Sequence, residues 1–550
     1  MKKRRFLNGW TLITAACFLF FLFFFLYPIS RIFINSVYNF ETGTFSMKSF
    51  VKFFTKRYYT NTVWNSLKVT SLATLSTAFF GGTLAYLART IRLRGKRVLD
   101  IVMLISVLSP PFIGAYSWIV LLGRAGVVTE FINKLFGIQF EGIYGFSGIL
   151  LVFTIKLSPL VYLYVSGALK NLDNSLNEAS ESMGCRGVRK IVTVILPLIL
   201  PTLLASALLV FMRALADFGT PMLIGEGYRT LPVLIYNSFI GEVSQDHSFA
   251  AAISVIIVAF TTAIFLLQRW VAGRVNIEMS SMNPLEPKKA TGIRNVLAHA
   301  YAYVFILLEL LPIIVVTFNS FQNTQGSMFV EGFSLTSYVK AFNSMGSSIA
   351  NTYMYSIAAL FIILVIGILV SYSSVRRPSV LTAVLDTTTM FPYIIPGSVL
   401  GISMLLAFNK PPLTLSGTAM IIIAAYVIRR LPYTIRSSSA ILRQISPSVE
   451  EASQSLGANG AETFVKVTVP MMISGVLPGA LMSWMSIISE LSASIMLYVG
   501  TTKTMTISIY TEVIRGNFGV ASALSTILIL STIVVLLTFF KLTGRSEIEL

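Results

Sequence analysis

The sequence is poor in the residues that build soluble active sites. It has only two cysteines, Cys17 and Cys185, and two histidines, His247 and His299. Cys17 falls in a long hydrophobic run and Cys185 in a polar loop, so a disulfide between them is not expected. No cluster of metal-ligating residues is visible, and no nucleophile, base and orienting group occur together. The sequence therefore predicts neither a metal site nor an enzyme.

Charged residues are also scarce. They make up 12% of the chain, whereas 55% is hydrophobic and the mean hydropathy is +0.77. This is too apolar for an ordinary soluble domain, and runs of about 20 apolar residues recur along the chain. Runs of that length favour helices over the alternating segments of an outer-membrane barrel, because a helix satisfies its own backbone hydrogen bonds in lipid. We predict an all-α, polytopic membrane protein.

The hydrophobic runs predict about 12 transmembrane helices, arranged as two sets of about six. The first set lies near residues 9–29, 63–88, 99–122, 147–169, 196–218 and 249–270, and the second near 297–318, 351–374, 384–408, 417–440, 469–490 and 517–540. We expect a first half at 1–270, a cytoplasmic linker at 271–295 and a second half at 296–550.

The distribution of basic residues predicts the orientation. The chain has 42 Lys and Arg against 23 Asp and Glu, a net charge of +19. With a cytoplasmic N-terminus most Lys and Arg fall on the cytoplasmic side, which predicts that both termini are cytoplasmic. The charge fits loops that face anionic lipid. It does not indicate nucleic acid, since no basic patch with interleaved aromatics lies outside the membrane.

Two stretches, at 178–197 and 451–470, share one framework of residues at one spacing. The framework comprises Glu178, Ala179, Ser180, Gly184, Gly187 and Pro197 in the first copy, and Glu451, Ala452, Ser453, Gly457, Gly460 and Pro470 in the second. A Glu-Ala-Ser start favours a short helix with a closely approachable face; the glycines permit a sharp turn, and the proline opens the next membrane helix. Such an element suits docking against another protein. The alternative is a hairpin that merely links two spans.

The duplication extends beyond these stretches. Asn65-Ser66 matches Asn351-Thr352, and Leu99-Asp100 matches Leu385-Asp386. Six spans per repeat give both copies the same orientation, so the halves should be related by an axis along the membrane normal. Two further matching segments, Arg229–Tyr236 and Lys503–Tyr510, predict short interfacial helices.

The paired stretches resemble the cytoplasmic coupling loop of ABC importer permeases. That pattern runs Glu-Ala-Ala, three residues, Gly, nine residues, Ile, one residue, Leu-Pro; here Ser180 and Ser453 replace the last Ala. The resemblance implies a type I ABC importer permease fold in a bacterial cytoplasmic (inner) membrane. It also implies two copies of a separate ATPase subunit docked on the cytoplasmic loops, and an extracytoplasmic substrate-binding protein.

The sequence contains no Gly-x-x-x-x-Gly-Lys-Ser/Thr phosphate loop. We therefore expect no cofactor on this chain, and ATP and Mg on the partner ATPase. External segments near 30–62, 220–248, 319–350 and 491–516 are the expected docking surface for the binding protein.

Ionisable residues inside the spans are also duplicated. Lys156 matches Arg429, and Asp217 matches Glu490. Such residues are costly in a membrane and are commonly functional. They either line the translocation pathway or form ion pairs, Lys156 with Asp217 and Arg429 with Glu490; Arg213 is an alternative partner for Asp217.

The run Ala216–Pro221, the run Arg429–Tyr433 and the fusion of two permease halves resemble the permeases of ferric iron importers. The resemblance implies ferric iron as the substrate, with phosphonates or sugar phosphates as the main alternatives. A different class, an ion-gradient-driven secondary transporter, would leave the duplicated loops without a reason.

Overall fold

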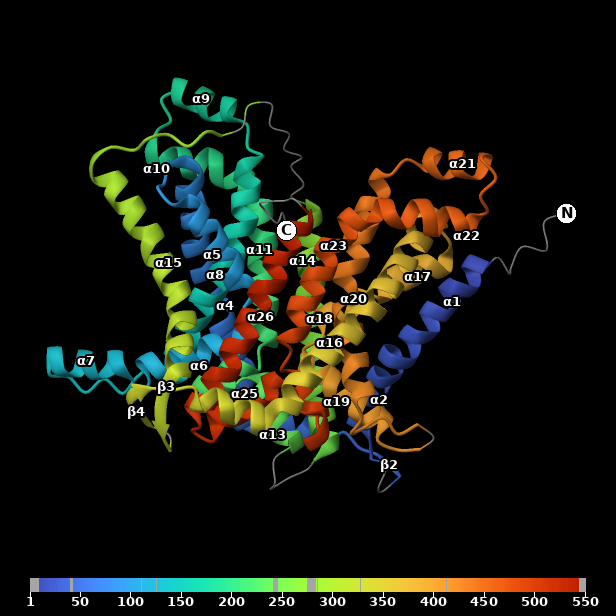
Figure 1. Ribbon diagram of the computed structural model, residues 1–550, viewed down its shortest axis with the longest axis horizontal. Helices are drawn as coiled ribbons and strands as arrows, with labels where there is room; N and C mark the ends of the chain where they lie inside the picture. The colour runs from blue at the N-terminus through green and yellow to red at the C-terminus, as the bar shows by residue number, and fades with distance from the viewer. Residues whose placement is uncertain are drawn as a thin grey trace. The chain divides into compact units, whose positions relative to one another are not determined.

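The computed structural model describes residues 9–39, 43–109, 111–124, 126–240, 246–274, 283, 285–326, 328–411 and 413–543. Most of these residues are helical (Figure 1), which confirms the predicted all-α class. Two small antiparallel hairpins are additional. They pair β1 (Tyr38–Asn39) with β2 (Thr44–Phe45), and β3 (Gln322–Gln325) with β4 (Met328–Phe333). Each hairpin follows the first span of its half, so the hairpins repeat with the helices.

Within the described residues, nine helices are long and apolar enough to cross a membrane, and a tenth arises if a pair bent by 112° counts as one span. The sequence predicted about 12 spans, and three of them account for the difference between that number and nine. The span predicted at 99–122 is divided into α5 (Lys96–Leu108) and α6 (Pro111–Leu122). The span predicted at 384–408 is the bent pair. Proline explains both breaks, since Pro111 and Pro396 lack the N–H that would continue the helix.

The third difference is α20 (Ala419–Gln444). It forms an unbroken helix of 26 residues, as predicted. It is less apolar than the other spans because Arg429, Arg430 and Arg436 all lie within it. A buried partner shared by Arg429 and Arg430, described below, replaces the lipid that an apolar helix would contact. Arg436 instead pairs with Asp386 at 3.6 Å in a more exposed place.

The chain forms two compact units, and neither is continuous in sequence. Unit 1 contains the described residues of 1–51, 238–258 and 335–548, and unit 2 those of 52–237 and 259–334. The first span of each half therefore belongs to the unit built mainly from the other half. The halves predicted at 1–270 and 296–550 remain a prediction about the sequence repeat, and they do not coincide with these folded units.

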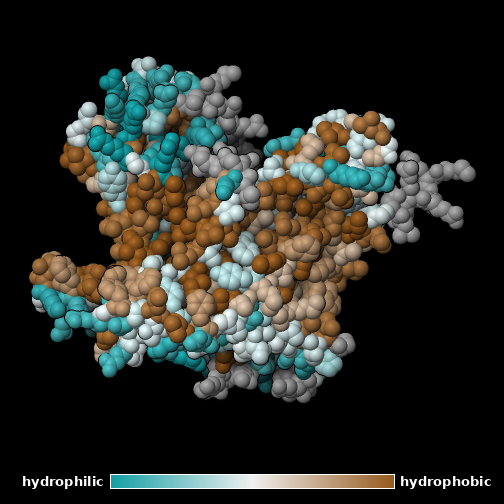
Figure 2. Space-filling model, in the orientation of Figure 1, coloured by the Kyte–Doolittle hydropathy of each residue, from teal (hydrophilic) through white to brown (hydrophobic). Residues whose placement is uncertain are grey.

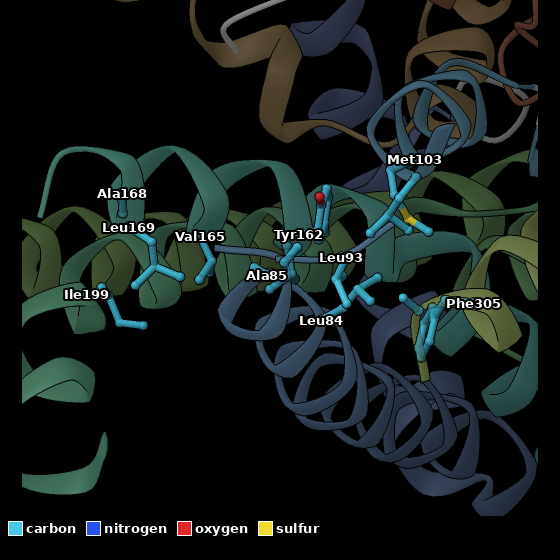
Figure 3. Close-up of a cluster of buried hydrophobic side chains, with 14 of the residues drawn as sticks. Leu84, Ala85, Leu93, Met103, Tyr162, Val165, Ala168, Leu169, Ile199 and Phe305 are labelled. Carbon is cyan, nitrogen blue, oxygen red and sulfur yellow. The ribbon is translucent and has the colours of Figure 1, made fainter. Parts of the chain in front are cut away.

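Unit 2 is built around α4 and α8, against which α5, α11 and α15 pack. Its further helices are α4 (Arg57–Thr90), α7 (Val127–Phe136), α8 (Gly145–Lys170), α9 (Asn174–Ser182), α10 (Gly187–Lys190), α11 (Leu196–Ala216), α12 (Gly219–Ile224) and α15 (Gly292–Phe321). Figure 3 shows its core, where α4, α5, α8, α11 and α15 contribute Leu84, Met103, Tyr162, Ile199 and Phe305 to one buried cluster. Phe305 lies on α15, the first span of the second half, so this span, which is exchanged between the units, is part of the core of unit 2.

Unit 1 is built around α16, α20 and α23. Its other helices are α1 (Gly9–Phe21), α2 (Tyr27–Val37), α16 (Thr336–Arg376), α17 (Val380–Thr388), α18 (Phe391–Ile394), α19 (Gly397–Phe408), α21 (Pro447–Ser455), α22 (Gly460–Thr463), α23 (Val469–Ile488), α24 (Ser494–Leu497), η4 (Gly500–Thr502) and α26 (Phe518–Thr543). The exchanged span is held by aromatic packing, because the ring of Trp10 lies 4.5 Å from that of Tyr372 and 4.9 Å from that of Phe464. Three helices, α3 (Lys48–Thr55), α13 (Leu231–Ile240) and α14 (His247–Arg274), contribute residues to both units.

In each unit a glycine lets the two central helices approach closely, and the two glycines stand at equivalent positions of the two sequence repeats. A Cβ on Gly81 of α4 would lie 3.0 Å from Cβ of Val161, and one on Gly367 of α16 would lie 2.8 Å from Cγ2 of Thr434. The α4–α8 contact in unit 2 thus recurs as the α16–α20 contact in unit 1. Small residues suit this role because helices in lipid associate through close packing.

Three short π-helical turns each end two residues before a proline. They are η1 (Leu22–Leu26), η2 (Ile191–Ile195) and η3 (Phe464–Thr468), followed by Pro28, Pro197 and Pro470. Proline has no N–H for the carbonyl four residues earlier, and its ring crowds that carbonyl, so the preceding turn widens. Pro197 and Pro470 therefore lie inside continuous helical segments, two residues after the end of the widened turn.

The two segments predicted as interfacial helices are helical: α13 (Leu231–Ile240) and α25 (Met505–Ile514). Ile507, Ser508 and Ile509 of α25 are fully buried, because α25 packs against α16 and α26, and Ile235 of α13 is fully buried as well. The interfacial position of both helices stays a prediction.

We expect Gly81→Ala to destabilise the protein and Gly82→Ala to leave it unchanged or slightly more stable. Both lie on α4 and gain the same helix propensity. A Cβ on Gly81 would lie 2.5 Å from the carbonyl oxygen of Ser158, whereas the nearest atom to one on Gly82 is 3.7 Å away. Overpacking should cost the Gly81 variant about 1–3 kcal/mol. Thermal unfolding in detergent measures both variants, and equal midpoints would contradict the close α4–α8 contact.

Candidate functional site

The first duplicated stretch folds as a capped helix followed by a tight turn. Asp173 caps α9 by accepting a hydrogen bond from the backbone N–H of Ser175 at 2.9 Å. At the other end the N–H of Cys185 donates to the carbonyl of Ser180 at 2.9 Å, and that of Gly184 to Glu181 at 3.0 Å. This is the Schellman pattern, which needs a residue with positive φ. Gly184 supplies it with φ +80°, and Gly187, at +63°, turns the chain into α10.

The second stretch ends α21 in the same way. The N–H of Ala458 donates to the carbonyl of Ser453 at 3.2 Å, and Gly457 has φ +98°. Gly460 begins α22 without positive φ, and there Asn459 caps the helix by accepting hydrogen bonds from two backbone N–H groups. The two loops therefore share their first turn and differ in their second.

Most of the predicted loop residues face outward. Glu178, Ala179, Gly184, Gly187, Pro197 and their counterparts Glu451, Ala452, Gly457, Gly460 and Pro470 are exposed, whereas Ser180 is buried and Ser453 half-buried. No neighbouring atom lies within 4 Å of a Cβ built on Gly184, Gly187, Gly457 or Gly460. The glycines at 184, 187 and 457 therefore serve the backbone conformation, not close packing inside the chain.

An apolar residue that was not among the predicted site residues lies at the tip of each loop. Met183 is 87% exposed and Leu456 is 90% exposed, and each lies directly before the positive-φ glycine. Large apolar side chains so fully exposed at one position of both copies indicate a surface that a partner covers. The signal was present in the sequence, since both copies have an apolar residue immediately before that glycine.

The two loops are anchored to their units by different contacts. In unit 1, Glu450 at the start of α21 is buried and accepts hydrogen bonds from Arg376 at 2.9 Å and Tyr372 at 3.0 Å. In unit 2, Asn177 occupies the matching place. There the first residue of α9, Asn174, donates its N–H to the carbonyl of Asn283 at 2.8 Å.

Asn283 belongs to the predicted linker 271–295, of which residues 275–282 and 284 lie outside the described residues. Lys288, also in this segment, exchanges backbone hydrogen bonds of 3.0 Å with Thr90 and Arg92. The described end of the linker is therefore fixed to unit 2 beside α9.

In the loop that contains α9 and α10, the hydrogen bond and charge of Lys190 lower the pKa of Glu181. The contact between these two residues should therefore persist into mildly acidic solution.

The duplicated charges are held differently in the two units. In unit 1, Arg429 and Glu490 form an ion pair, and Arg430, which the sequence analysis did not single out, pairs with the other carboxylate oxygen. Glu490 also accepts a hydrogen bond from the N–H of Ala493 at 3.1 Å. One buried carboxylate thus serves two arginines. The Nε atoms of Arg429 and Arg430 have no hydrogen-bond partner among the described residues.

In unit 2 the predicted pair of Lys156 with Asp217 does not form a direct ion pair among the described residues. Lys156 instead donates to the carbonyls of Ser106 and Ser109, both at 2.9 Å, at the end of α5. Asp217, two residues before α12, accepts hydrogen bonds from the hydroxyl of Thr220 at 2.9 Å and from its N–H at 3.3 Å. The prediction was wrong here because both groups find closer partners at helix ends.

Glu309 of α15 is a second buried acid in the electrostatic surroundings of Lys156, and it was not among the predicted site residues. Glu309 is buried, and its Oε1 has no hydrogen-bond partner among the described residues. Arg213 is exposed on α11. Because Glu309 lies on the exchanged span, the sequence repeat alone could not identify it.

No group of three or more His, Cys, Asp or Glu side chains that could hold a metal ion occurs in the described part of the chain. The notable features are therefore two exposed, matching loops and two buried charge clusters, one of each per unit. They belong to a helical protein with a duplicated architecture, which is the arrangement of a membrane permease.

The comparison with known families identifies the class. The chain belongs to the family of binding-protein-dependent transport system inner membrane components, whose model matches residues 78–277 and 363–542. It is thus a multi-pass inner membrane permease of the ATP-binding cassette importers, with the family motif present twice. The predicted permease class and type I fold are confirmed, and the family implies a binding protein and an ATPase as partners.

Several curated relatives align with this chain. A ferric transport system permease protein of Actinobacillus pleuropneumoniae is 29% identical over 96% of this chain and 77% of its own length. A putative ferric transport system permease protein of Haemophilus influenzae is 28% identical, covering 92% and 80%. A putative 2-aminoethylphosphonate transport system permease protein of Salmonella typhi is 25% identical over 46% of this chain and 88% of its own length. The last protein has about half the length of this chain, as expected if this chain contains two permease halves.

We expect Glu490→Gln to destabilise the protein far more than Asp217→Asn, although the two acids match in the repeat. Removing the charge of Glu490 leaves Arg429 and Arg430 uncompensated, which should cost about 3–5 kcal/mol. Asparagine at 217 can still accept from the N–H of Thr220 through its one side-chain oxygen, and its amide can donate to the hydroxyl of Thr220, so that variant should lose about 1 kcal/mol or less. Denaturant unfolding in detergent compares them, and equal losses would show that the two acids have equivalent roles.

Proposed function

We propose that this chain forms the translocation pathway of a ferric iron importer and binds one separate ATPase subunit at each duplicated loop. The two ATPase copies would lie on the cytoplasmic side, together with both chain termini, and a substrate-binding protein would dock on the opposite face. ATP and Mg would be bound, and ATP hydrolysed, by the ATPase. The observation that carries the proposal is the pair of exposed loops with the same helix-ending turn.

The geometry of the loop tips supports the docking role. In each loop the Schellman turn fixes the orientation of the exposed apolar side chain, Met183 or Leu456, at the end of a short helix. An exposed residue of that kind gains most when it enters a preformed pocket, because little conformational entropy is lost on binding. Glu178 and Glu451 lie one to two turns earlier on the same helices and are exposed as well. They add a charge that can select the partner's orientation.

The anchors of the loops support transmission of movement. Glu450 joins the base of α21 to Arg376 and Tyr372 at the end of α16. Asn283 joins the base of α9 to the segment that precedes α15. A force on either loop would therefore reach a long spanning helix through buried or backbone hydrogen bonds. A loop attached only through flexible linkers would not transmit such a force.

The substrate assignment is supported by the relatives that align with nearly the whole chain, since both are described as ferric transport permeases. A phosphonate is the second candidate, because a half-length relative is described as a 2-aminoethylphosphonate permease. Uptake of radiolabelled ferric iron and of 2-aminoethylphosphonate by the complete reconstituted system separates them. The proposal expects iron uptake only, and uptake of the phosphonate alone would overturn the substrate assignment.

The transport class has a separate test. Proteoliposomes that contain the chain without an ATPase should show no uptake under an imposed proton or sodium gradient. Adding the ATPase, the binding protein and ATP should start it. Gradient-driven uptake by the chain alone would contradict coupling to ATP and favour a secondary transporter.

We expect the double variant Met183→Asp, Leu456→Asp to lose ATPase binding and transport-linked ATP hydrolysis while it remains folded. Loss of a central apolar contact costs about 2 kcal/mol or more at an interface, which is roughly 30-fold in affinity per site. Val380→Asp is the matched control, because Val380 is also strongly exposed but lies outside the loops, in the first turn of α17. Pull-down of the ATPase and hydrolysis rates measure the effect, and wild-type values for the double variant would exclude the tips from docking.

A further inference from the structure

Helix α7 is a feature of unit 2 that the transport proposal does not use. It lies between α6 and α8, and it has no helical counterpart in the second repeat, where the described residues between α19 and α20 form turns and loop. In Figure 1, α7 runs across the direction of the neighbouring spans α8 and α15. It precedes the first residue of α8, whereas α9 follows the last. Since α8 has 26 residues, about 39 Å of helix separates the two ends.

The sequence of α7 separates polar from apolar residues completely. At 3.6 residues per turn its apolar residues occupy one half of the helix surface and its polar residues the other. The apolar half comprises Val127, Val128, Phe131, Ile132, Leu135 and Phe136, and the polar half Thr129, Glu130, Asn133 and Lys134.

Most of the apolar half is not covered by the protein. Phe131 is 64% exposed and Leu135 is 61% exposed. Val128 at the base packs against the buried cluster of unit 2. In Figure 2 the hydrophobic side of α7 faces the apolar belt of the spanning helices, and its hydrophilic side faces away. A helix that presented its apolar face to a water-soluble partner would have the opposite orientation.

We propose that α7 is an interfacial anchor that lies in the membrane leaflet opposite α9, with Phe131 and Leu135 inserted among the lipids. A helix with this amphipathicity lies in the plane of the interface, with its apolar face roughly 5–10 Å into the boundary between headgroups and acyl chains. The charges of Glu130 and Lys134 cancel on the polar face, so insertion depends on apolar burial and not on anionic lipid.

The connections of α7 make it a rigid extension of α6. The N–H of Ile143, after the helix, donates to the carbonyl of Leu122 at 2.9 Å, and the N–H of Phe140 donates to Oδ1 of Asn133 at 2.8 Å. A Cβ on Gly142, which has φ +90°, would lie 2.7 Å from the carbonyl oxygen of Leu122. The anchor therefore holds the end of α6, the second part of a broken span, at the membrane surface.

The test places single cysteines on the two faces of α7 in a chain with Cys17→Ala and Cys185→Ser. Leu135→Cys lies near the middle of the apolar half and Glu130→Cys near the middle of the polar half. Each is labelled with an environment-sensitive fluorophore and reconstituted without partners in phosphatidylcholine vesicles. We expect the label at 135 to emit at shorter wavelength, to be quenched by spin-labelled lipid, and to be several-fold less accessible to iodide than the label at 130. Phe131→Cys provides a second apolar site if the first variant fails to fold.

Lipid composition and partners supply the controls. The proposal expects the same quenching in vesicles that contain phosphatidylglycerol. Equal iodide access at both positions would overturn it. Protection of the label at 135 only after a binding protein is added would show a protein docking site, and protection only at high protein density would show contact with a second copy. Either result would contradict the proposal, and none of these measurements depends on transport.

Discussion

Close approach of helix backbones inside lipid is the constraint on which the rest of the structure depends. Because apolar side chains gain little by leaving lipid for a protein interior, spanning helices associate through tight packing and a few polar contacts. Gly81 and Gly367 provide such packing at one repeat position, against Val161 and Thr434. These contacts hold α4 to α8 and α16 to α20, and the loops α9 and α21 extend directly from the ends of α8 and α20. The positions of the loops thus follow from the glycine contacts.

The two units share this framework but not its electrostatics. The buried cluster of unit 1 has two arginines on one carboxylate, whereas Lys156 of unit 2 donates to the carbonyls of Ser106 and Ser109 and has the buried Glu309 in its electrostatic surroundings. Glu309 lies on the exchanged span, so duplication of the halves did not duplicate its environment. The loop anchors differ as well, with an Arg–Glu pair in unit 1 and the linker in unit 2. A fused chain can diverge in this way, because its two copies of each residue need not stay identical.

Much of the architecture could be predicted from the sequence, because lipid permits few ways to satisfy a backbone. Long apolar runs predicted the helices, and the repeated framework from Glu178 to Pro197 predicted both loops. The exchange of first spans could not be predicted, since no local pattern in residues 9–37 states which helices they contact. The same limit explains the wrong pairing of Lys156 with Asp217. The matching positions in the repeat correctly predicted that Arg429 pairs with Glu490. In unit 2, however, Lys156 and Asp217 have nearer partners, Ser109 for Lys156 and Thr220 for Asp217, both next to the end of a helix. Met183 and Leu456 were overlooked because exposure is a property of the folded loop.

The central claim is that both loop tips contact a separate ATPase. Site-directed cross-linking tests it most directly. Single cysteines introduced at positions 183 and 456, in a chain whose native cysteines have been replaced, are treated with a short bifunctional reagent in the complete transporter. The account predicts that each position forms a covalent adduct with an ATPase subunit and that a chain with both cysteines captures two. Failure of either position to cross-link, while cysteines on the opposite face react with the ATPase, would contradict it.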